Sequence, residues 1–288
     1  MVVFIFLALR RAGNKIGDLT VLAMPPYVLE RDRRDAAPDT GVDTLAKRPL
    51  KALFFDVDDT LYSSTDFAAN ARRQAAQAMI RTGLKVDEET LLAELDEVIK
   101  EFGSNDDKHF DKLLRRMPEE TFPSGSRMFI VAAGIIAYHQ CKFRSFSPYE
   151  DALEVMKRLH EKGLPMGIIS AGVPVKQVEK IIRLNLLPLI RFEHIFITES
   201  VGIAKTNPKI YMRACRSVGA KPQECGYVGD NPQVDIDVPH RIGMRTFFSR
   251  RGGKYENLPG IVEPDHVVHN FWDLLDIIEN QYEIIPNA

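Results

Sequence analysis

Carboxylates with the spacing of a reactive or metal-binding group follow two short apolar runs of the chain. Asp56 and Asp58 stand in the segment DVDDT, which continues the run ALFF, and Asp230 ends the segment GYVGD. Asp235 follows five residues later. Carboxylates that are brought close together repel one another and need a cation to compensate. Because no histidine or cysteine clusters with them, this set of oxygen ligands favours Mg²⁺ over zinc.

A serine and a lysine occupy comparable positions farther along the chain. Ser170 ends the run MGIIS and precedes Ala171 and a glycine, whose backbone N–H groups could approach an anion. Lys205 lies in GIAKTNPKIY, just before a helix that should begin at Pro208. Taken singly, a plain turn explains Ser170 equally well, and a lysine such as Lys205 is usually only a surface residue. Together, the acids, hydroxyl and cation suit phosphoryl transfer, in which a carboxylate can also be the nucleophile.

The short apolar runs that end in these residues predict buried parallel strands. The expected strands begin at Ala52 and cover 166–170, 195–198, 226–230 and 245–248, with a weaker one at 266–268. Helical patterns alternate with them at 173–186, 208–218, 233–242 and 270–279. This alternation predicts an α/β domain on a parallel sheet, and open sheets of this kind bind ligands at the carboxyl ends of their strands.

A further helix is predicted over 147–162, before the second strand. Ser147 and Glu150 have the spacing of a capping box, Pro148 stands at the first helical position and Gly163 follows the last turn. Four apolar side chains with helical spacing would form its buried stripe: Ala152, Val155, Met156 and Leu159.

A long interval separates the first strand from the second and must carry structure of its own. Helical patterns cover 66–82, 88–102, 108–117 and 127–142 within it, with polar breaks between them. We therefore expect a helical cap over 64–146, inserted into an α/β core formed by 49–63 and 147–288. Residues 13–48 lack helix or strand periodicity, and 1–48 are expected to form a flexible extension.

Composition limits the partners and the cellular setting. The formal net charge is −2, so no overall basic field attracts nucleic acid or an anionic membrane. The apolar run Val2–Leu9 is too short to span a bilayer. It is also a poor secretory signal, because no charged side chain precedes it and no small-residue cleavage pattern follows closely. Three widely spaced cysteines fit neither a disulfide framework nor a metal site, which favours a cytoplasmic location. We expect a small phosphorylated metabolite as partner, and a monomer or homodimer.

The order Asp-x-Asp-x-Thr, Ser, Lys and Gly-Asp-x-x-x-x-Asp, with a helical insertion after the first strand, resembles the haloacid dehalogenase-like hydrolase superfamily over about 50–278. The resemblance implies a Rossmann-like parallel sheet with an α-helical cap, Mg²⁺ as cofactor, and phosphatase activity through an aspartyl-phosphate. The cap segments ARRQAAQAMIRTGLKVDEET and IKEFGSNDDKHFDKLLRRM, with GVPVKQVEKIIRL, resemble helical-cap (subfamily IA) phosphatases of the archaeal glyceraldehyde 3-phosphate type.

The same resemblance implies roles for the acids. Asp56 would be the nucleophile, and Asp58 the general acid and base that protonates the leaving group and then activates water. Asp230 would hold Mg²⁺ together with Asp56 and the backbone carbonyl of Asp58. Asp59 corresponds to no family role and is expected to be a loop acid.

For the phosphoryl group, the resemblance implies contacts with Ser170 and Ala171. Lys205 would neutralise the nucleophile and the phosphate, and Asp235 would orient that lysine or support the metal. Two positions depart from the family pattern: Thr206 replaces the usual proline after the motif lysine, and Ala171 stands where related chains often carry an acid. Neither departure removes a catalytic group.

Three other functions remain open. A haloacid dehalogenase would use the same nucleophile, but halide needs no protonation, so Asp58 argues against it. A phosphotransferase would pass the phosphoryl group to a second hydroxyl instead of water. A catalytically silent binding module would have no chemical reason to keep both Asp56 and Asp58.

Overall fold

The structure is a computed structural model that describes residues 47–286. The predicted flexible extension, apart from its last two residues, and the apolar run Val2–Leu9 lie outside this range. Within residues 47–286, no helix combines the length and the apolar composition that a membrane span needs.

Six parallel strands form the central sheet, in the order β4-β3-β2-β5-β6-β7. If the six strands are numbered along the chain from β2, their order in the sheet is 3-2-1-4-5-6. This is the order of a Rossmann-type doubly wound sheet. The predicted Rossmann-like α/β class is therefore confirmed. The strands are β2 (Ala52–Phe55), β3 (Met166–Ser170), β4 (Ile195–Ile197), β5 (Cys225–Gly229), β6 (Arg245–Ser249) and β7 (His266–Val268).

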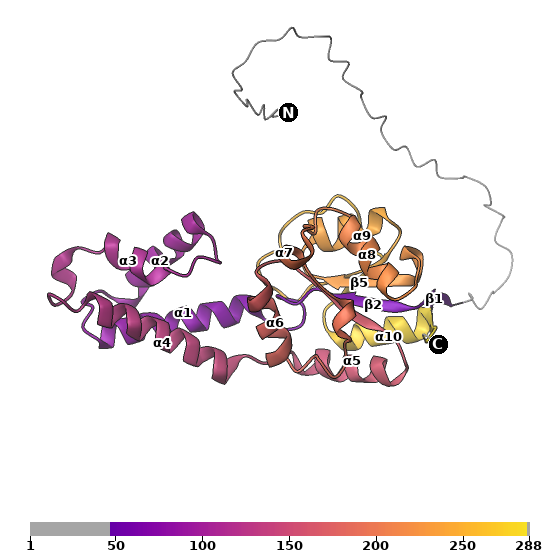
Figure 1. The fold of residues 1–288 in the computed structure, drawn as a ribbon, viewed down its shortest axis with the longest axis horizontal. Coiled ribbons are helices and arrows are strands. Elements are labelled where there is room, and N and C mark those ends of the chain that lie inside the picture. The colour runs from indigo at the N-terminus through magenta and orange to yellow at the C-terminus, as the bar shows by residue number, and fades with distance from the viewer. Residues whose placement is uncertain (1–46, 287–288) are drawn as a thin grey trace, which may run out of the picture. The chain divides into compact units, whose positions relative to one another are not determined.

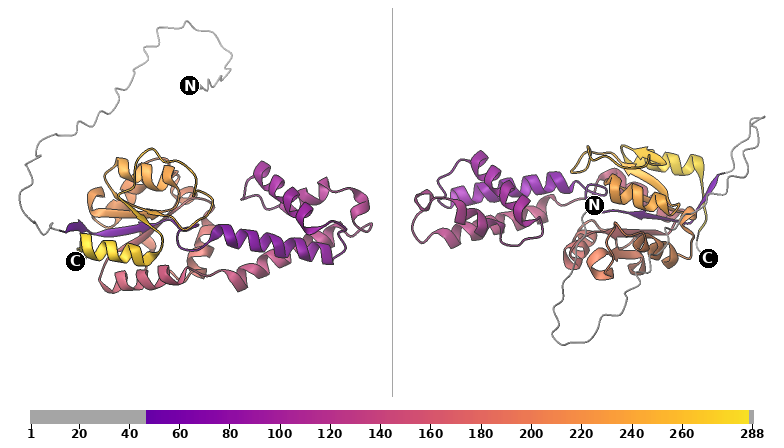
Figure 2. Two further views of the ribbon diagram at one scale, coloured as in Figure 1. Left: turned by 180° about the vertical axis from the view of Figure 1, so that it is seen from behind. Right: turned by 90° about the horizontal axis from the view of Figure 1, so that it is seen from above.

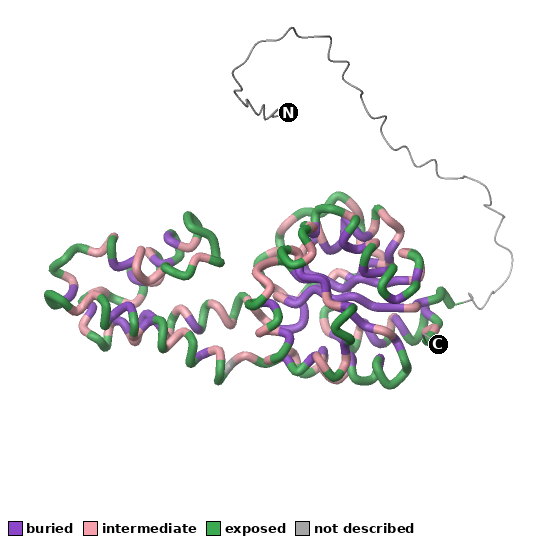
Figure 3. Tube along the Cα trace, viewed as in Figure 1, coloured by how far each residue is buried: buried purple, intermediate pink, exposed green. Residues whose placement is uncertain are grey.

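All four residues of β2 are buried because helices cover both faces of the sheet. Leu53 and Phe55 pack in one cluster with α5 (Glu150–Glu161), α6 (Pro174–Arg183) and α10 (Phe271–Gln281). Ala52 and Phe54 face the opposite cluster, with α8 (Lys209–Ser217) and α9 (Asp237–Arg241). In Figure 1, α5 and α10 lie below the strands and α8 and α9 above them, and Figure 2 shows the same layers from behind. The buried strands form the purple centre of Figure 3.

Helix α5 begins later than its sequence predicts. It starts at Glu150 with Tyr149 as N-cap, without a side-chain capping bond, so the predicted capping box at Ser147 is wrong. The backbone N–H of Tyr149 donates instead to the carbonyl of Leu61, at 2.9 Å, which draws the chain toward the loop after β2. The predicted buried stripe and the glycine at the end, with a φ of +77° at Gly163, are confirmed.

Four helices with their own hydrophobic cluster follow β2. Ser63 and Asp87 cap the first two, each accepting a bond from the backbone N–H three residues later. The cluster includes Met79, Leu91 and Leu113. The division into cap and core at the predicted residues stays a prediction. The helices are α1 (Ser64–Arg81), α2 (Glu88–Phe102), α3 (His109–Arg116) and α4 (Arg127–Ser145), with a short 3₁₀ turn at Glu119–Thr121.

Several short elements lack a sequence signal. Strand β1 (Arg48–Leu50) pairs in parallel with β8 (Tyr282–Ile284), which joins the start of the described chain to its end. The helix predicted over 233–242 is split into a π-helical turn, Pro232–Ile236, and α9. The remaining elements are α7 (Thr198–Val201) and 3₁₀ turns at Phe192–His194 and Pro222–Glu224.

Candidate active site

The predicted site residues meet where the strand order reverses, between β2 and β5. Phe55 of β2 pairs with Ile168 of β3 on one side and Val228 of β5 on the other. Asp56 therefore leaves the sheet between the carboxyl ends of β3 and β5. Ser170 ends β3, and Asp230 directly follows β5. This is the position at which open α/β sheets bind their ligands.

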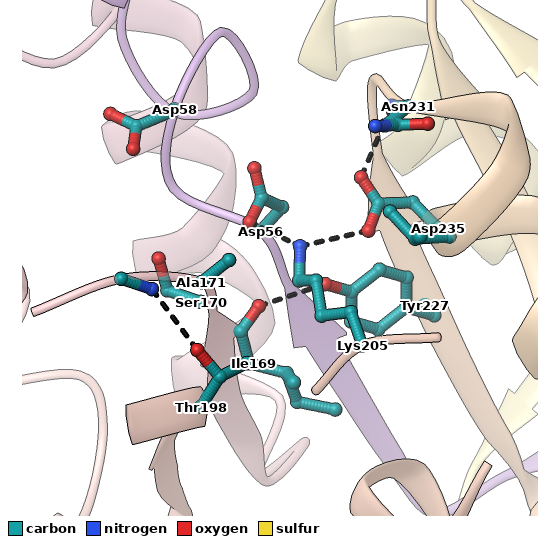
Figure 4. A network of polar contacts seen from close by, with 12 residues as sticks. Asp56, Asp58, Ile169, Ser170, Ala171, Thr198, Lys205, Tyr227, Asn231 and Asp235 are labelled. Atoms are coloured by element: carbon teal, nitrogen blue, oxygen red, sulfur yellow. Dashed lines mark hydrogen bonds and ion pairs between the residues drawn. The ribbon is translucent and has the colours of Figure 1, made fainter. Parts of the chain in front are cut away.

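Lys205 joins two carboxylates at the centre of this group. Its Nζ lies 2.5 Å from Oδ1 of Asp56 and 2.8 Å from Oδ1 of Asp235. Figure 4 marks both contacts with dashed lines. All three side chains are buried, so their attraction is little weakened by water. The two carboxylates hold the pKa of Lys205 well above its usual range, although burial opposes this. The lysine is therefore a permanent cation in contact with Asp56.

A glycine makes room for Asp235. Asp235 lies in the π-helical turn after β5 and accepts a hydrogen bond from the backbone N–H of Asn231 at 3.1 Å. A Cβ atom on Gly229 would lie only 2.5 Å from the Asp235 side chain, closer than real Cβ atoms approach. The glycine in GYVGD thus allows the carboxylate to reach Lys205.

Three carboxylates could share a cation. One oxygen from each of Asp56, Asp230 and Asp235 lies within 4.8 Å of the others. Burial, then the charges of Asp56 and Asp235, raises the pKa of Asp230 to about 9. Burial likewise raises the pKa of Asp56 to about 7, although Lys205 opposes the shift. Within residues 47–286, Oδ2 of Asp230 is buried without a hydrogen-bond partner. A buried, unpartnered carboxylate oxygen beside two other acids fits a divalent cation.

Asp58 does not belong to this group of three carboxylates, and Figure 4 shows its side chain apart from Asp56 and Asp235. Lys180 donates to both of its oxygens, at 2.7 and 2.6 Å, and the hydroxyl of Tyr62 donates to Oδ1 at 2.5 Å. Sequence reasoning missed both partners. Lys180 is one of several charged residues on α6, and no local pattern shows which of them faces the loop after β2.

Gln177 holds the segment that follows β3. Ser170 Oγ donates to Oε1 of Gln177 at 3.1 Å, and Nε2 of Gln177 donates to the carbonyl of Ala171 at 2.9 Å. Thr198 accepts the backbone N–H of Gly172 at 3.1 Å. Ser170 is buried and Ala171 is exposed at the end of the strand. No local pattern indicates the role of Gln177, because that role depends on the rotation of α6 against the sheet.

Asp59 has a structural role that the sequence did not indicate. It is buried, has a φ of +53°, and accepts bonds from the backbone N–H and the hydroxyl of Thr65, at 2.9 and 2.7 Å. Thr65 lies in the first turn of α1. Asp59 therefore ties the loop that carries Asp56 and Asp58 to the first inserted helix.

Comparison with known proteins gives one consistent result. A family model described as haloacid dehalogenase-like hydrolase matches residues 50–243. A glyceraldehyde 3-phosphate phosphatase from Methanopyrus kandleri is 43% identical over 234 residues, covering 80% of this chain and 97% of the relative. One from Pyrococcus furiosus is 40% identical over 236 residues, covering 81% and 95%. The crystal structure of a HAD phosphatase from Thermococcus onnurineus shares the fold, with a TM-score of 0.57 at 19% identity, covering 81% of this chain and all of the other.

Proposed function

The chain belongs to the haloacid dehalogenase-like hydrolase family, and from this premise we propose that it is a Mg²⁺-dependent phosphatase for a small phosphorylated metabolite. Its main support within the site is the buried Asp56–Lys205–Asp235 arrangement beside the unpartnered oxygen of Asp230. A carboxylate in contact with a permanent cation, next to a set of oxygen ligands, suits nucleophilic attack on a phosphoryl group.

In the first half-reaction, a carboxylate oxygen of Asp56 bonds to phosphorus. The bond from phosphorus to the leaving oxygen breaks, and Asp58 gives its proton to that oxygen. The products are an alcohol and an aspartyl-phosphate on Asp56, with Asp58 left as a carboxylate.

In the second half-reaction, Asp58 takes a proton from water while the water oxygen bonds to phosphorus. The bond between phosphorus and Asp56 breaks, which releases phosphate and restores both aspartates to their starting states. Atoms and charges balance over the cycle, in which one ester and one water become one alcohol and one phosphate.

The surrounding residues bind and neutralise the phosphoryl group. Lys205 offsets the negative charge of the nucleophile and the phosphate, and Ser170 and the backbone at Ala171 contact phosphoryl oxygens. Asp235 keeps Lys205 in place. Asp56, Asp230 and the backbone carbonyl of Asp58 would hold Mg²⁺, which when bound supplies positive charge against the phosphoryl oxygens.

The first candidate substrate is glyceraldehyde 3-phosphate. Relatives from Methanopyrus kandleri and Pyrococcus furiosus carry the name of that activity, and this chain covers 97% and 95% of their lengths. A monomer or homodimer in the cytoplasm, without nucleic-acid or membrane partners, stays our expectation.

The test is phosphate release from a panel of phosphorylated metabolites, measured with Mg²⁺ and with EDTA. The panel includes glyceraldehyde 3-phosphate, phosphoglycolate, sugar phosphates and nucleoside monophosphates. We expect metal-dependent release from one or a few of these compounds. If none of these compounds releases phosphate, the result would contradict the proposal and favour a dehalogenase, a phosphotransferase or a binding module.

A further inference from the structure

Asp58 is held by two donors that come from different parts of the fold. The ammonium group of Lys180, on α6, bridges both carboxylate oxygens at 2.6 and 2.7 Å. Tyr62, in the loop after β2, adds a third bond at 2.5 Å. The side chains of Lys180 and Asp58 are 23% and 34% exposed, so water reaches the pair only in part. Three bonds to two oxygens fix both the position and the plane of the carboxyl group.

Lys180 is itself fixed relative to the phosphate-binding segment. Gln177 lies three residues before it on α6, a spacing that places both side chains on one side of the helix. Gln177 is buried and bonded to Ser170. One side of α6 thus holds Ser170 and Asp58 at the same time.

The neighbouring side of α6 is anchored to the inserted helices. Glu179 accepts a bond from Lys142 of α4 at 3.2 Å, and Arg183 donates to Glu179 at 2.9 Å. An ion pair thus ties α6 to α4 on one side, while Gln177 ties it to Ser170 on the other, and Lys180 extends its ammonium group from the helix between these two contacts.

We propose that Lys180 is a positioning residue for proton transfer by Asp58. The inference rests on the proposed phosphatase function, in which Asp58 protonates the leaving group. Lys180 and Tyr62 hold the carboxyl group in one orientation, and general acid catalysis depends on such placement. When the proton moves to the leaving oxygen, the ammonium group also complements the carboxylate that remains.

This role makes the contribution of Lys180 depend on the leaving group. The leaving group of glyceraldehyde 3-phosphate is the alkoxide of glyceraldehyde, which is a strong base and must receive a proton as it departs. The nitrophenolate of p-nitrophenyl phosphate is a weak base and departs without one. Loss of Lys180 should therefore slow phosphoryl transfer from glyceraldehyde 3-phosphate to Asp56 much more than phosphoryl transfer from p-nitrophenyl phosphate.

The experiment measures kcat and KM of the Mg²⁺-loaded full chain for both esters in Lys180→Met, Lys180→Arg and a control. Lys157→Met is the control: Lys157 is exposed on α5, and within residues 47–286 its side chain makes no hydrogen bond or ion pair. We expect Lys180→Met to lower kcat/KM, which reports the first half-reaction alone, for glyceraldehyde 3-phosphate on the order of ten- to a hundredfold more than for p-nitrophenyl phosphate. Lys180→Arg should restore most of the loss, and the control should match the wild type.

Equal losses of kcat/KM on both esters, or no loss on either, would overturn the inference while leaving the phosphatase proposal intact. A wild-type protein that hydrolyses neither these two esters nor any other compound of the metabolite panel would overturn the phosphatase proposal and this inference with it. Tyr62→Phe supplies a second variant in case Lys180→Met does not fold. It removes one bond to Asp58 and should show the same selectivity to a smaller degree, and an unselective effect would again count against the inference.

Discussion

The ammonium group of Lys205 lies 2.5 Å from Oδ1 of Asp56, and only 7% and 9% of the two side chains are exposed. A buried pair of this kind has lost its hydration, so each partner depends on the other for compensation. Asp235, on the far side of the lysine, adds a second carboxylate to the same cation. Lys205 is thus required for the stability of the site as well as for its chemistry.

Replacing this lysine should be costly. In Lys205→Met, Asp56 and Asp235 remain buried together without their cation, and we expect a loss of about 3–5 kcal/mol in the free energy of unfolding. Urea denaturation of the metal-free protein measures this loss. Lys209→Met, an equal change of charge at an exposed position on α8, is the matched control and should stay within about 0.5 kcal/mol of the wild type. Similar stabilities of the two variants would contradict a structural role for Lys205.

The sequence predicted the sheet and the residues along its edge because both depend on local patterns. The apolar runs identify the strands, and the residue after each run must emerge at the carboxyl end. Asp56, Ser170 and Asp230 could therefore be placed together without knowledge of distances. The contact of Lys205 with Asp56 was implied by resemblance and is present in the structure at hydrogen-bond distance.

The contacts of Gln177 and Lys180 could not be predicted from the sequence, because they depend on how α6 is rotated against the sheet. The start of α5 was misplaced for a related reason: its competing partner, the carbonyl of Leu61, is remote in sequence. The role of Asp59 depends on a positive φ, which local composition does not reveal at an aspartate.

Mg²⁺ should stabilise the protein more at high pH than at low pH. The folded pKa of Asp230, about 9, lies above its ordinary value of 3.8. Between these values the folded carboxyl keeps a proton that the unfolded one has released, so the stability of the metal-free protein falls as pH rises. Mg²⁺ replaces that proton, and its effect should therefore grow with pH.

Thermal unfolding with Mg²⁺ and with EDTA, at pH 5.5, 7.0 and 8.5, checks this expectation. The increase in Tm caused by Mg²⁺ should be largest at pH 8.5. Asp230→Asn should lose most of the Mg²⁺ effect and show a flatter pH dependence without metal. A Tm increase that is constant, or that is larger at pH 5.5, would argue against metal binding at these carboxylates.

Gly253 contacts the loop after β2 and should not tolerate a side chain. A Cβ atom on Gly253 would lie 2.9 Å from Cγ of Asp59, and the φ of +104° disfavours any side chain. Gly219 also has a positive φ, +66°, but a Cβ there would meet nothing within 4 Å. We expect Gly253→Ala to destabilise the protein by about 1–3 kcal/mol more than Gly219→Ala. It should also lower kcat, because Asp59 shares its loop with Asp56 and Asp58.

Urea denaturation and phosphate release from both glycine variants provide the comparison. A destabilisation that is equal in the two variants would show backbone strain alone. In that case the packing of Asp59 against Gly253 would have no measurable role in holding the loop.

The most direct test of the central claim is chemical identification of the nucleophile. The Mg²⁺-loaded protein is quenched in acid during turnover and reduced with borohydride, which converts an aspartyl-phosphate to homoserine, and the site is then located by mass spectrometry of the peptides. We predict homoserine at position 56 in the wild type, and neither reduction nor turnover in Asp56→Asn. Sustained phosphate release without reduction at position 56, or reduction at Asp58 or Asp230 instead, would contradict the assignment of Asp56 as the nucleophile.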